Sequence, residues 1–163
     1  MNILYTAFKG KYNASNYLIA GMQGDTLFLT NSFQELEQDV ASIDEHYDAV
    51  LMFGVAPEPR DTVRVETCAL YIGEYITTDF EIEALTCGLQ SCGIPCFVSD
   101  KPTTYLCNAA YYHMLKRIPG SVFVHIPSIQ YMNTAMMEKL SVFCAEILGN
   151  SRSVLLVVLT PIC

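Results

Sequence analysis

Short apolar segments alternate with segments of helical periodicity along the whole chain. Residues 48–55 (DAVLMFGV) form one unbroken apolar run, as expected for a parallel strand covered on both faces. Comparable strand-like runs occupy 2–8, 25–29, 62–71, 96–99 and 121–126. Helices are predicted at 16–22, 32–47, 105–117 and 135–149, and from Thr77 or Thr78 to about Cys92. This alternation predicts an α/β fold, a three-layer sandwich with a mostly parallel central sheet flanked by helices, in a single domain over 1–163.

Several local signals support these boundaries. Asn13 or Ser15 can cap the first helix, and Ser32 followed by Glu35 matches a capping box. The apolar tail 154–163 is too short to span a membrane, and we interpret it as a final strand or a subunit contact.

Composition excludes several classes of protein. The formal net charge of −8 over 163 residues argues against binding to nucleic acid or to an anionic membrane surface. The first residues hold no long apolar stretch, so no signal peptide is expected. Seven cysteines, an odd number without C-x2-C spacing, indicate reduced thiols in a cytoplasmic protein rather than a disulfide framework or a zinc site. No metal and no cofactor is expected.

One cysteine and one histidine are placed for chemistry. Cys107 lies near the start of a predicted helix, where partial positive charge stabilises a thiolate. His125 lies near the end of the next strand, and one right-handed crossover would return it to the same rim of the sheet. Glu66 could orient the imidazole. A lone cysteine near a helix start and a lone histidine in an apolar strand are more often packing residues, so the pattern alone favours packing over a cysteine hydrolase.

The residues around these positions resemble a known family. Five segments of the chain are similar to segments of pyroglutamyl peptidase type I, also called pyrrolidone-carboxylate peptidase. They are Tyr105-Leu106-Cys107-Asn108 with Tyr112 and Leu115, Phe123-Val124-His125-Ile126-Pro127, Gly93-Ile94-Pro95 with Val98-Ser99, Gly54-Val55-Ala56 with Val65-Glu66 and Ala69, and Thr6-Ala7-Phe8 with Asn13-Ala14-Ser15. The matches keep the family's order. The resemblance implies a cysteine peptidase that removes an N-terminal pyroglutamyl residue, with Cys107 as nucleophile, His125 as base and Glu66 as third triad member.

The chain also departs from the family pattern. The aromatic loop between Phe8 and Asn13 is reduced to 9–12, so Phe8, Tyr12 and Asn13 are the expected substrate-binding residues. The segment 70–77 is shortened, and Pro102-Thr103 replaces the Ala-Gly before the nucleophile. Two alternatives follow: a hydrolase acting on a different small amide or ester, and a diverged binding module without activity. The resemblance further implies a peptide or small-amide substrate and a possible homo-oligomer, dimer or tetramer.

Overall fold

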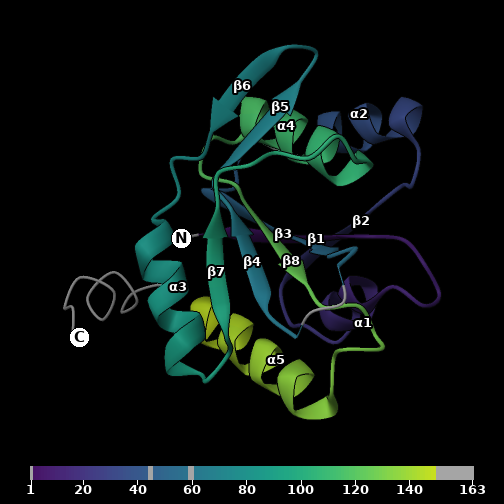
Figure 1. Cartoon of the computed structure of the whole chain (residues 1–163). Coiled ribbons are helices and arrows are strands. Elements are labelled where there is room, and N and C mark those ends of the chain that lie inside the picture. The colour runs from purple at the N-terminus through teal and green to yellow at the C-terminus, as the bar shows by residue number, and fades with distance from the viewer. Residues whose placement is uncertain (1, 44–45, 59–60, 150–163) are drawn as a thin grey trace.

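The computed structural model describes residues 2–43, 46–58 and 61–149, and its centre is a six-stranded sheet with the strand order β2-β1-β3-β8-β4-β7 (Figure 1). Four of the five strand pairings are parallel, and the pairing of β4 with β8 is antiparallel. The expected α/β fold with a mostly parallel sheet is therefore confirmed. The tail 154–163 lies outside the described residues.

The elements follow the predicted alternation. The strands are β1 (Ile3–Phe8), β2 (Asp25–Leu29), β3 (Ala49–Val55), β4 (Val63–Glu66), β5 (Cys68–Tyr71), β6 (Glu74–Thr77), β7 (Cys96–Ser99) and β8 (Val122–Ile126). The helices are α1 (Ala14–Ala20), α2 (Phe33–Ala41), α3 (Ile82–Ser91), α4 (Leu106–Arg117) and α5 (Thr134–Gly149).

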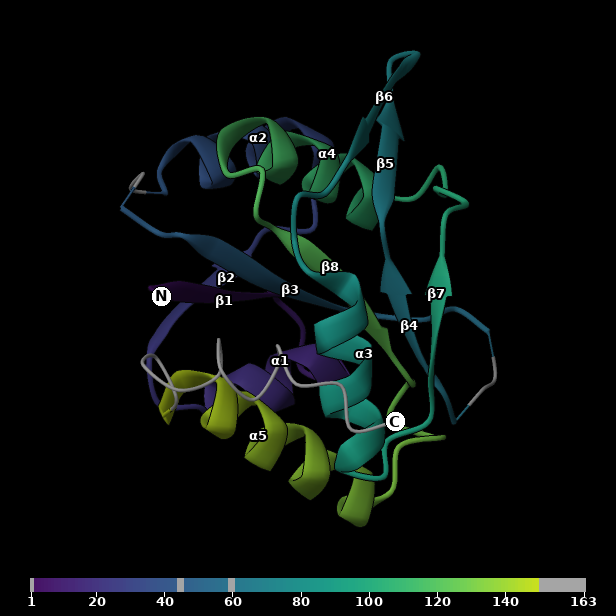
Figure 2. The ribbon, with the colours of Figure 1, turned by 90° about the vertical axis from the view of Figure 1, so that its left-hand side faces the viewer.

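Helices cover both faces of the sheet. One apolar cluster joins α1, α3 and α5 to one face, and a second joins α2 and α4 to the other. Figure 2 shows α2 and α4 together on one side and α1 and α5 on the opposite side. Successive side chains of a strand point to opposite faces of the sheet, so neighbouring strand residues belong to different clusters and contact different helices.

The strand directions differ from the expected crossover. Strand β4 lies between β7 and β8, and both β4 and β7 run opposite to β8. The prediction that one right-handed crossover brings β7 and β8 to the same carboxyl rim is therefore wrong. A pattern of apolar residues does not encode strand direction, because a buried parallel strand and a buried antiparallel strand have the same composition.

The predicted strand 62–71 is two strands that belong to different sheets. Thr67 separates them, because its amide and its hydroxyl both donate to the Ser99 carbonyl oxygen, at 2.9 and 3.1 Å. Strands β5 and β6 then form a separate antiparallel hairpin that projects beyond the main sheet (Figure 1). Neither Thr77 nor Thr78 caps a helix, because Thr77 ends β6 and α3 begins only at Ile82.

Two helix boundaries also need correction. Helix α2 ends at Ala41 rather than at residue 47, and Ser32 precedes it without a side-chain capping bond, so the capping box is wrong. Asn13 does cap α1, because its side-chain oxygen accepts from the Ser15 amide at 3.0 Å. None of the helices in the described part of the chain has the length and apolar character that crossing a membrane requires.

Candidate active site

Alternate residues of a strand point to opposite faces of the sheet, and this alternation places the polar candidates on the face that α2 and α4 cover. Val63 and Val65 of β4 belong to the cluster on the opposite face, so Arg64 and Glu66 point toward α4. The same alternation in β8 turns Phe123 and His125 toward α4. Arg64 stands opposite His125 in the antiparallel ladder, which brings the two side chains together.

Glu66 and His125 form a buried pair. The ring nitrogen Nδ1 of His125 lies 2.8 Å from Oε1 of Glu66, and the residues are only 2% and 3% exposed. Phe123 packs against the imidazole with ring centroids 4.3 Å apart. An imidazole whose Nδ1 is held by a carboxylate can present Nε2 as a proton acceptor, which is the arrangement that a general base requires.

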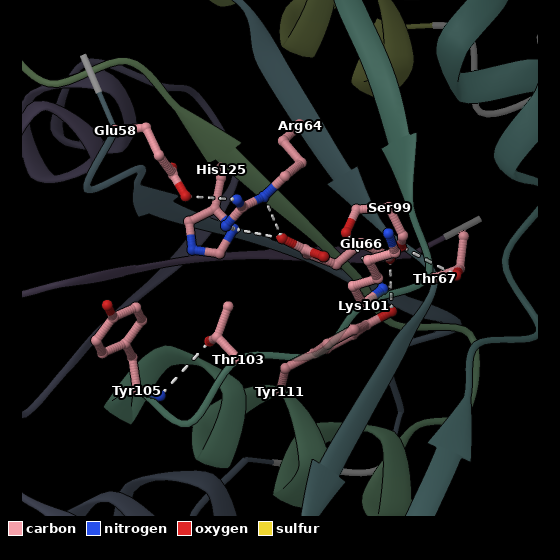
Figure 3. A network of polar contacts seen from close by, with 10 residues as sticks. All are labelled: Glu58, Arg64, Glu66, Thr67, Ser99, Lys101, Thr103, Tyr105, Tyr111 and His125. Atoms are coloured by element: carbon pink, nitrogen blue, oxygen red, sulfur yellow. Dashed lines mark hydrogen bonds and ion pairs between the residues drawn. The ribbon is translucent and has the colours of Figure 1, made fainter. Parts of the chain in front are cut away.

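Arg64 is a member of this cluster that the sequence analysis missed. Its Nε donates to Oε1 of Glu66 at 2.6 Å, and its Nη1 donates to Glu58 at 3.1 Å (Figure 3). Its Nη2 lies 3.1 Å from Nδ1 of His125. The spacing of two residues between Arg64 and Glu66 in a strand is the signal that could have placed both on one face.

Cys107 is the second residue of α4 and is half-buried beside the α2–α4 cluster. Burial raises the pKa of its thiol; the Thr103 side chain and the Asn108 and Cys107 amides oppose the rise, and the Glu66 charge adds to it. The amides at the helix start act in the expected direction, but desolvation outweighs them, so the pKa of the thiol is raised overall. Among the described residues, Cys107 makes no hydrogen bond to His125.

A small cavity lies between the pair and the start of α4. It holds about 10 Å³ and is lined by Glu66, Cys68, Pro102, Thr103, Asn108, Tyr111, Phe123 and His125. This volume is about what one water molecule needs. Buried Oε2 of Glu66 has no hydrogen-bond partner, so a polar acceptor is available at this place. Figure 3 shows Thr103 between the His125–Glu66 pair and Tyr105 of the α4 N-terminus.

A larger groove of about 270 Å³ lies on the outer side of the same helix start. Residues from the β5–β6 hairpin, the beginning of α2 and the first turn of α4 line it: Phe33, Leu70, Tyr71, Ile72, Gly73, Thr104, Tyr105, Asn108 and Ala109. Asn108 joins helix and hairpin, because its side chain donates to the Leu70 carbonyl at 2.6 Å and accepts from the Leu70 amide at 3.2 Å. The groove is therefore held in a defined position at the start of α4.

The expected substrate-binding residues have different surroundings. Phe8 is buried in the α2–α4 cluster. Asn13 uses its side-chain oxygen to cap α1 and to accept from the Ser15 hydroxyl at 2.7 Å. Tyr12 is 75% exposed, with Lys11 5.6 Å from its ring centre. Their role in substrate binding stays a prediction.

Two chemical alternatives can be assessed on the described residues. They contain no group of three or more His, Cys, Asp or Glu side chains placed to hold a metal ion. The six cysteines among them (Cys68, Cys87, Cys92, Cys96, Cys107 and Cys144) form no disulfide with one another, and Cys163 lies outside the described part of the chain.

Comparisons with known proteins were made for sequence and for fold. No protein-family model matches the chain. A pyrrolidone-carboxylate peptidase of Vibrio vulnificus strain YJ016 is 28% identical, and the match covers 58% of this chain and 57% of that protein. The chain thus spans somewhat more than half the length of the curated relatives it matches.

Solved structures extend the likeness to most of the chain. A pyrrolidone carboxyl peptidase from Fervidobacterium islandicum superposes with a TM-score of 0.72 at 21% identity, covering 92% of this chain and 97% of that one. The enzyme from Thermus thermophilus gives a TM-score of 0.68 at 21% identity, covering 86% and 98%. At this identity the superpositions show the fold, and together with the sequence match they confirm the resemblance of this chain to the pyrrolidone-carboxylate peptidase family.

Proposed function

We propose that this chain is a cysteine peptidase that removes an N-terminal pyroglutamyl residue from peptides, with Cys107, His125 and Glu66 as its triad. The observation that carries the proposal is the buried hydrogen bond of 2.8 Å between His125 and Glu66, on the sheet face that α4 covers. A buried imidazole–carboxylate pair beside a cysteine at a helix start is the arrangement of a thiol hydrolase. The similarity to pyrrolidone-carboxylate peptidases supplies the substrate class.

The chemistry proceeds in two halves. Nε2 of His125 accepts the proton of the Cys107 thiol, and the sulfur attacks the carbonyl carbon of the pyroglutamyl residue. The carbon–nitrogen bond then breaks, and His125 returns the proton to the leaving amine. Water hydrolyses the thioester through the same base. The Cys107 amide belongs to the first turn of α4, where helix N–H groups lack intrahelical acceptors, so it can donate to the oxyanion.

The thiol must therefore lose its proton when substrate is bound, because burial raises its pKa in the free protein. Substrate that fills the site also brings the reacting groups closer, as catalytic hydrogen bonds commonly tighten only in the complex. Thr103 hydrogen-bonds the thiol and also lines the small cavity beside His125.

The groove at the start of α4 is the candidate substrate site. It is lined by Phe33, Leu70, Ile72 and Tyr105, among others. A pyroglutamyl ring is uncharged and small, so its recognition needs apolar walls and amide hydrogen bonds. The groove offers apolar walls although the loop 9–12 is short, and Tyr12 remains a candidate for a further wall.

Release of coumarin from a pyroglutamyl-aminomethylcoumarin substrate tests the proposal. Cys107→Ala should abolish release, because it removes the thiol that forms the thioester. Cys87→Ala, which removes an exposed thiol of α3, is the matched control and should retain full activity. Full activity in Cys107→Ala would refute the triad. Release from other blocked peptides or lactams, without release from the pyroglutamyl substrate, would instead support a hydrolase with a different small-amide or ester substrate.

One observation favours a binding module as a second candidate. The Cys107 thiol has a raised pKa and no hydrogen bond to His125 within the described structure. Calorimetric binding of a pyroglutamyl amide, with no product after long incubation, would identify this function.

A further inference from the structure

Arg64 occupies a position that the triad chemistry does not require. Its strand register places it opposite His125, two residues before Glu66 and on the same face. Only 13% of its side chain is exposed. A guanidinium in such a position is charged at every accessible pH, so it acts on the neighbouring ring as a fixed cation.

The contacts of Arg64 and Glu66 meet at a single nitrogen. Nδ1 of His125 lies 2.8 Å from Oε1 of Glu66 and 3.1 Å from Nη2 of Arg64. In a neutral imidazole Nδ1 either donates or accepts, so it can bond only one of these two groups at a time. The shorter contact, to a carboxylate, favours Nδ1–H donating to Glu66. Arg64 then presents a positive charge to a ring nitrogen that already carries a proton.

This placement opposes protonation of the whole ring. A buried carboxylate stabilises an imidazolium, and Oε2 of Glu66 has no other hydrogen-bond donor to weaken the effect. Arg64 weakens it in two ways: its Nε donates to the same Oε1 at 2.6 Å, and its charge repels a cation on the ring. An imidazolium cannot accept the thiol proton, so the free enzyme needs a neutral ring.

We propose that Arg64 is a positioning residue that keeps His125 neutral and in the Nδ1–H tautomer, and that Glu58 limits this effect by sharing the guanidinium charge. The proposal rests on the proposed peptidase function only for its consequence in catalysis. Glu58 binds Nη1 of Arg64 at 3.1 Å, and its side chain is 42% exposed. With a neutral ring, the cluster of one guanidinium and two carboxylates has a net charge of minus one. The imidazolium that forms during the reaction is therefore still compensated.

The described residues bring few other titratable groups to the ring. Besides Glu66 and Arg64 from β4 and Glu58 from the segment after β3, they are Cys68 of β5 and Cys107 and Tyr111 of α4. Burial raises the pKa of both Tyr111 and Cys107, so neither adds a negative charge near neutral pH. The charge acting on His125 is thus set by the two carboxylates and Arg64.

Opposite shifts of the pH profile test the proposal. Without the cation in Arg64→Met, the ring should hold a proton at neutral pH, and the acid limb of kcat/KM should move up by about one pH unit or more. Glu58→Gln should move the acid limb down, because the Arg64 charge is then no longer partly neutralised by Glu58 and acts fully on the His125–Glu66 pair. Arg64→Lys, which keeps the charge, should restore most of the wild-type profile. Lys139→Met removes a hydrogen bond to the Gly93 carbonyl on the opposite face and should change nothing.

Nitrogen-15 NMR of the labelled histidines gives a readout that does not depend on activity. The His125 signals are assigned by their loss in His125→Gln. The wild type should show the neutral Nδ1–H tautomer at pH 7, and Arg64→Met should show the imidazolium. A wild-type imidazolium, or shifts in the same direction for Arg64→Met and Glu58→Gln, would overturn the proposal. Should Arg64→Met fail to fold, Glu58→Gln still decides, because Glu58 is half-exposed. If no substrate is hydrolysed, the proposed peptidase function is refuted, but the nitrogen-15 signals still test the proposed effect of Arg64 on His125.

Discussion

Gly54 of β3 is the position at which the smallest change should disturb the candidate site most. It pairs with His125 across the parallel β3–β8 ladder. A Cβ added there would lie 2.6 Å from Cζ of Phe123, 2.9 Å from its Cε2 and 3.7 Å from Cδ2 of His125. The Phe123 ring cannot retreat freely, because it is 1% exposed and packs between His125 and Tyr111.

The size of the effect follows from this contact. Ordinary carbon–carbon contact distances are ~3.5–4.0 Å, so the added methyl group overlaps the ring by about 1 Å. Inserting one methyl group into a packed core costs about 1–3 kcal/mol. For a chain of this size, about 2 kcal/mol corresponds to a fall in Tm of roughly 4–8 °C. Because Phe123 packs against the imidazole, the His125 ring should also shift, and a misplacement of ~1 Å can cost about 100-fold in rate.

Urea unfolding followed by far-UV circular dichroism measures the change in free energy, and coumarin release measures kcat/KM. Gly21→Ala is the matched control: a Cβ there has no neighbour within 4 Å, and the residue already has right-handed backbone angles. Gly54→Ala should lose stability and activity, while Gly21→Ala should keep both.

A second substitution tests the cause. Phe123→Leu removes ring atoms that the new methyl group would overlap, so the double variant should lose less stability than the sum of the single changes. Equal stability of Gly54→Ala and Gly21→Ala, or simple additivity in the double variant, would show that the close contact with Phe123 is not what requires glycine at this position.

Two further predictions concern the groove and the thiol. Ile72→Asn should stabilise the protein by about 1 kcal/mol in urea unfolding, because Ile72 is 86% exposed and its φ of 50° disfavours a β-branched side chain; unchanged stability would show that the turn carries no strain. Alkylation of Cys107 by iodoacetamide, followed by mass spectrometry, should be slow at pH 7 and rise with pH, because burial raises the pKa of the thiol and only the thiolate reacts. Thr103→Val should slow it further by removing a bond that lowers this pKa, and faster alkylation in that variant would contradict the assignment.

The sheet could be predicted where a strand is covered on both faces. The run 48–55 has no polar interruption, and β3 is buried from Ala49 to Gly54. The break at Thr67 could not be predicted in the same way, because it depends on two hydrogen bonds to Ser99, more than thirty residues away. The β5–β6 turn was missed because Ile72-Gly73 lacks the Asn-Gly or Asp-Gly pair that usually occupies a turn with two positive φ angles.

The site could be predicted by residue type but not by geometry. The motifs around Glu66 and His125 identified a pair that the structure shows in hydrogen-bond contact. Their position depends on an antiparallel strand between β7 and β8, which the expected crossover did not include. Arg64 was missed because a charged residue inside a β-branched run is usually assigned to solvent, whereas here two carboxylates and an imidazole surround it.

The two parts of the candidate site are under different structural constraints. His125, Glu66 and Gly54 are themselves buried within their strands, so a change at any of them is transmitted to the core. The groove is lined instead by partly exposed side chains such as Phe33, Ile72 and Tyr105, which few buried contacts restrain. Substitutions in the groove can therefore alter which ligand binds without moving the His125–Glu66 pair. For this reason the position of the His125–Glu66 pair follows from the strands, while the substrate must be found by testing groove variants against a panel of blocked peptides.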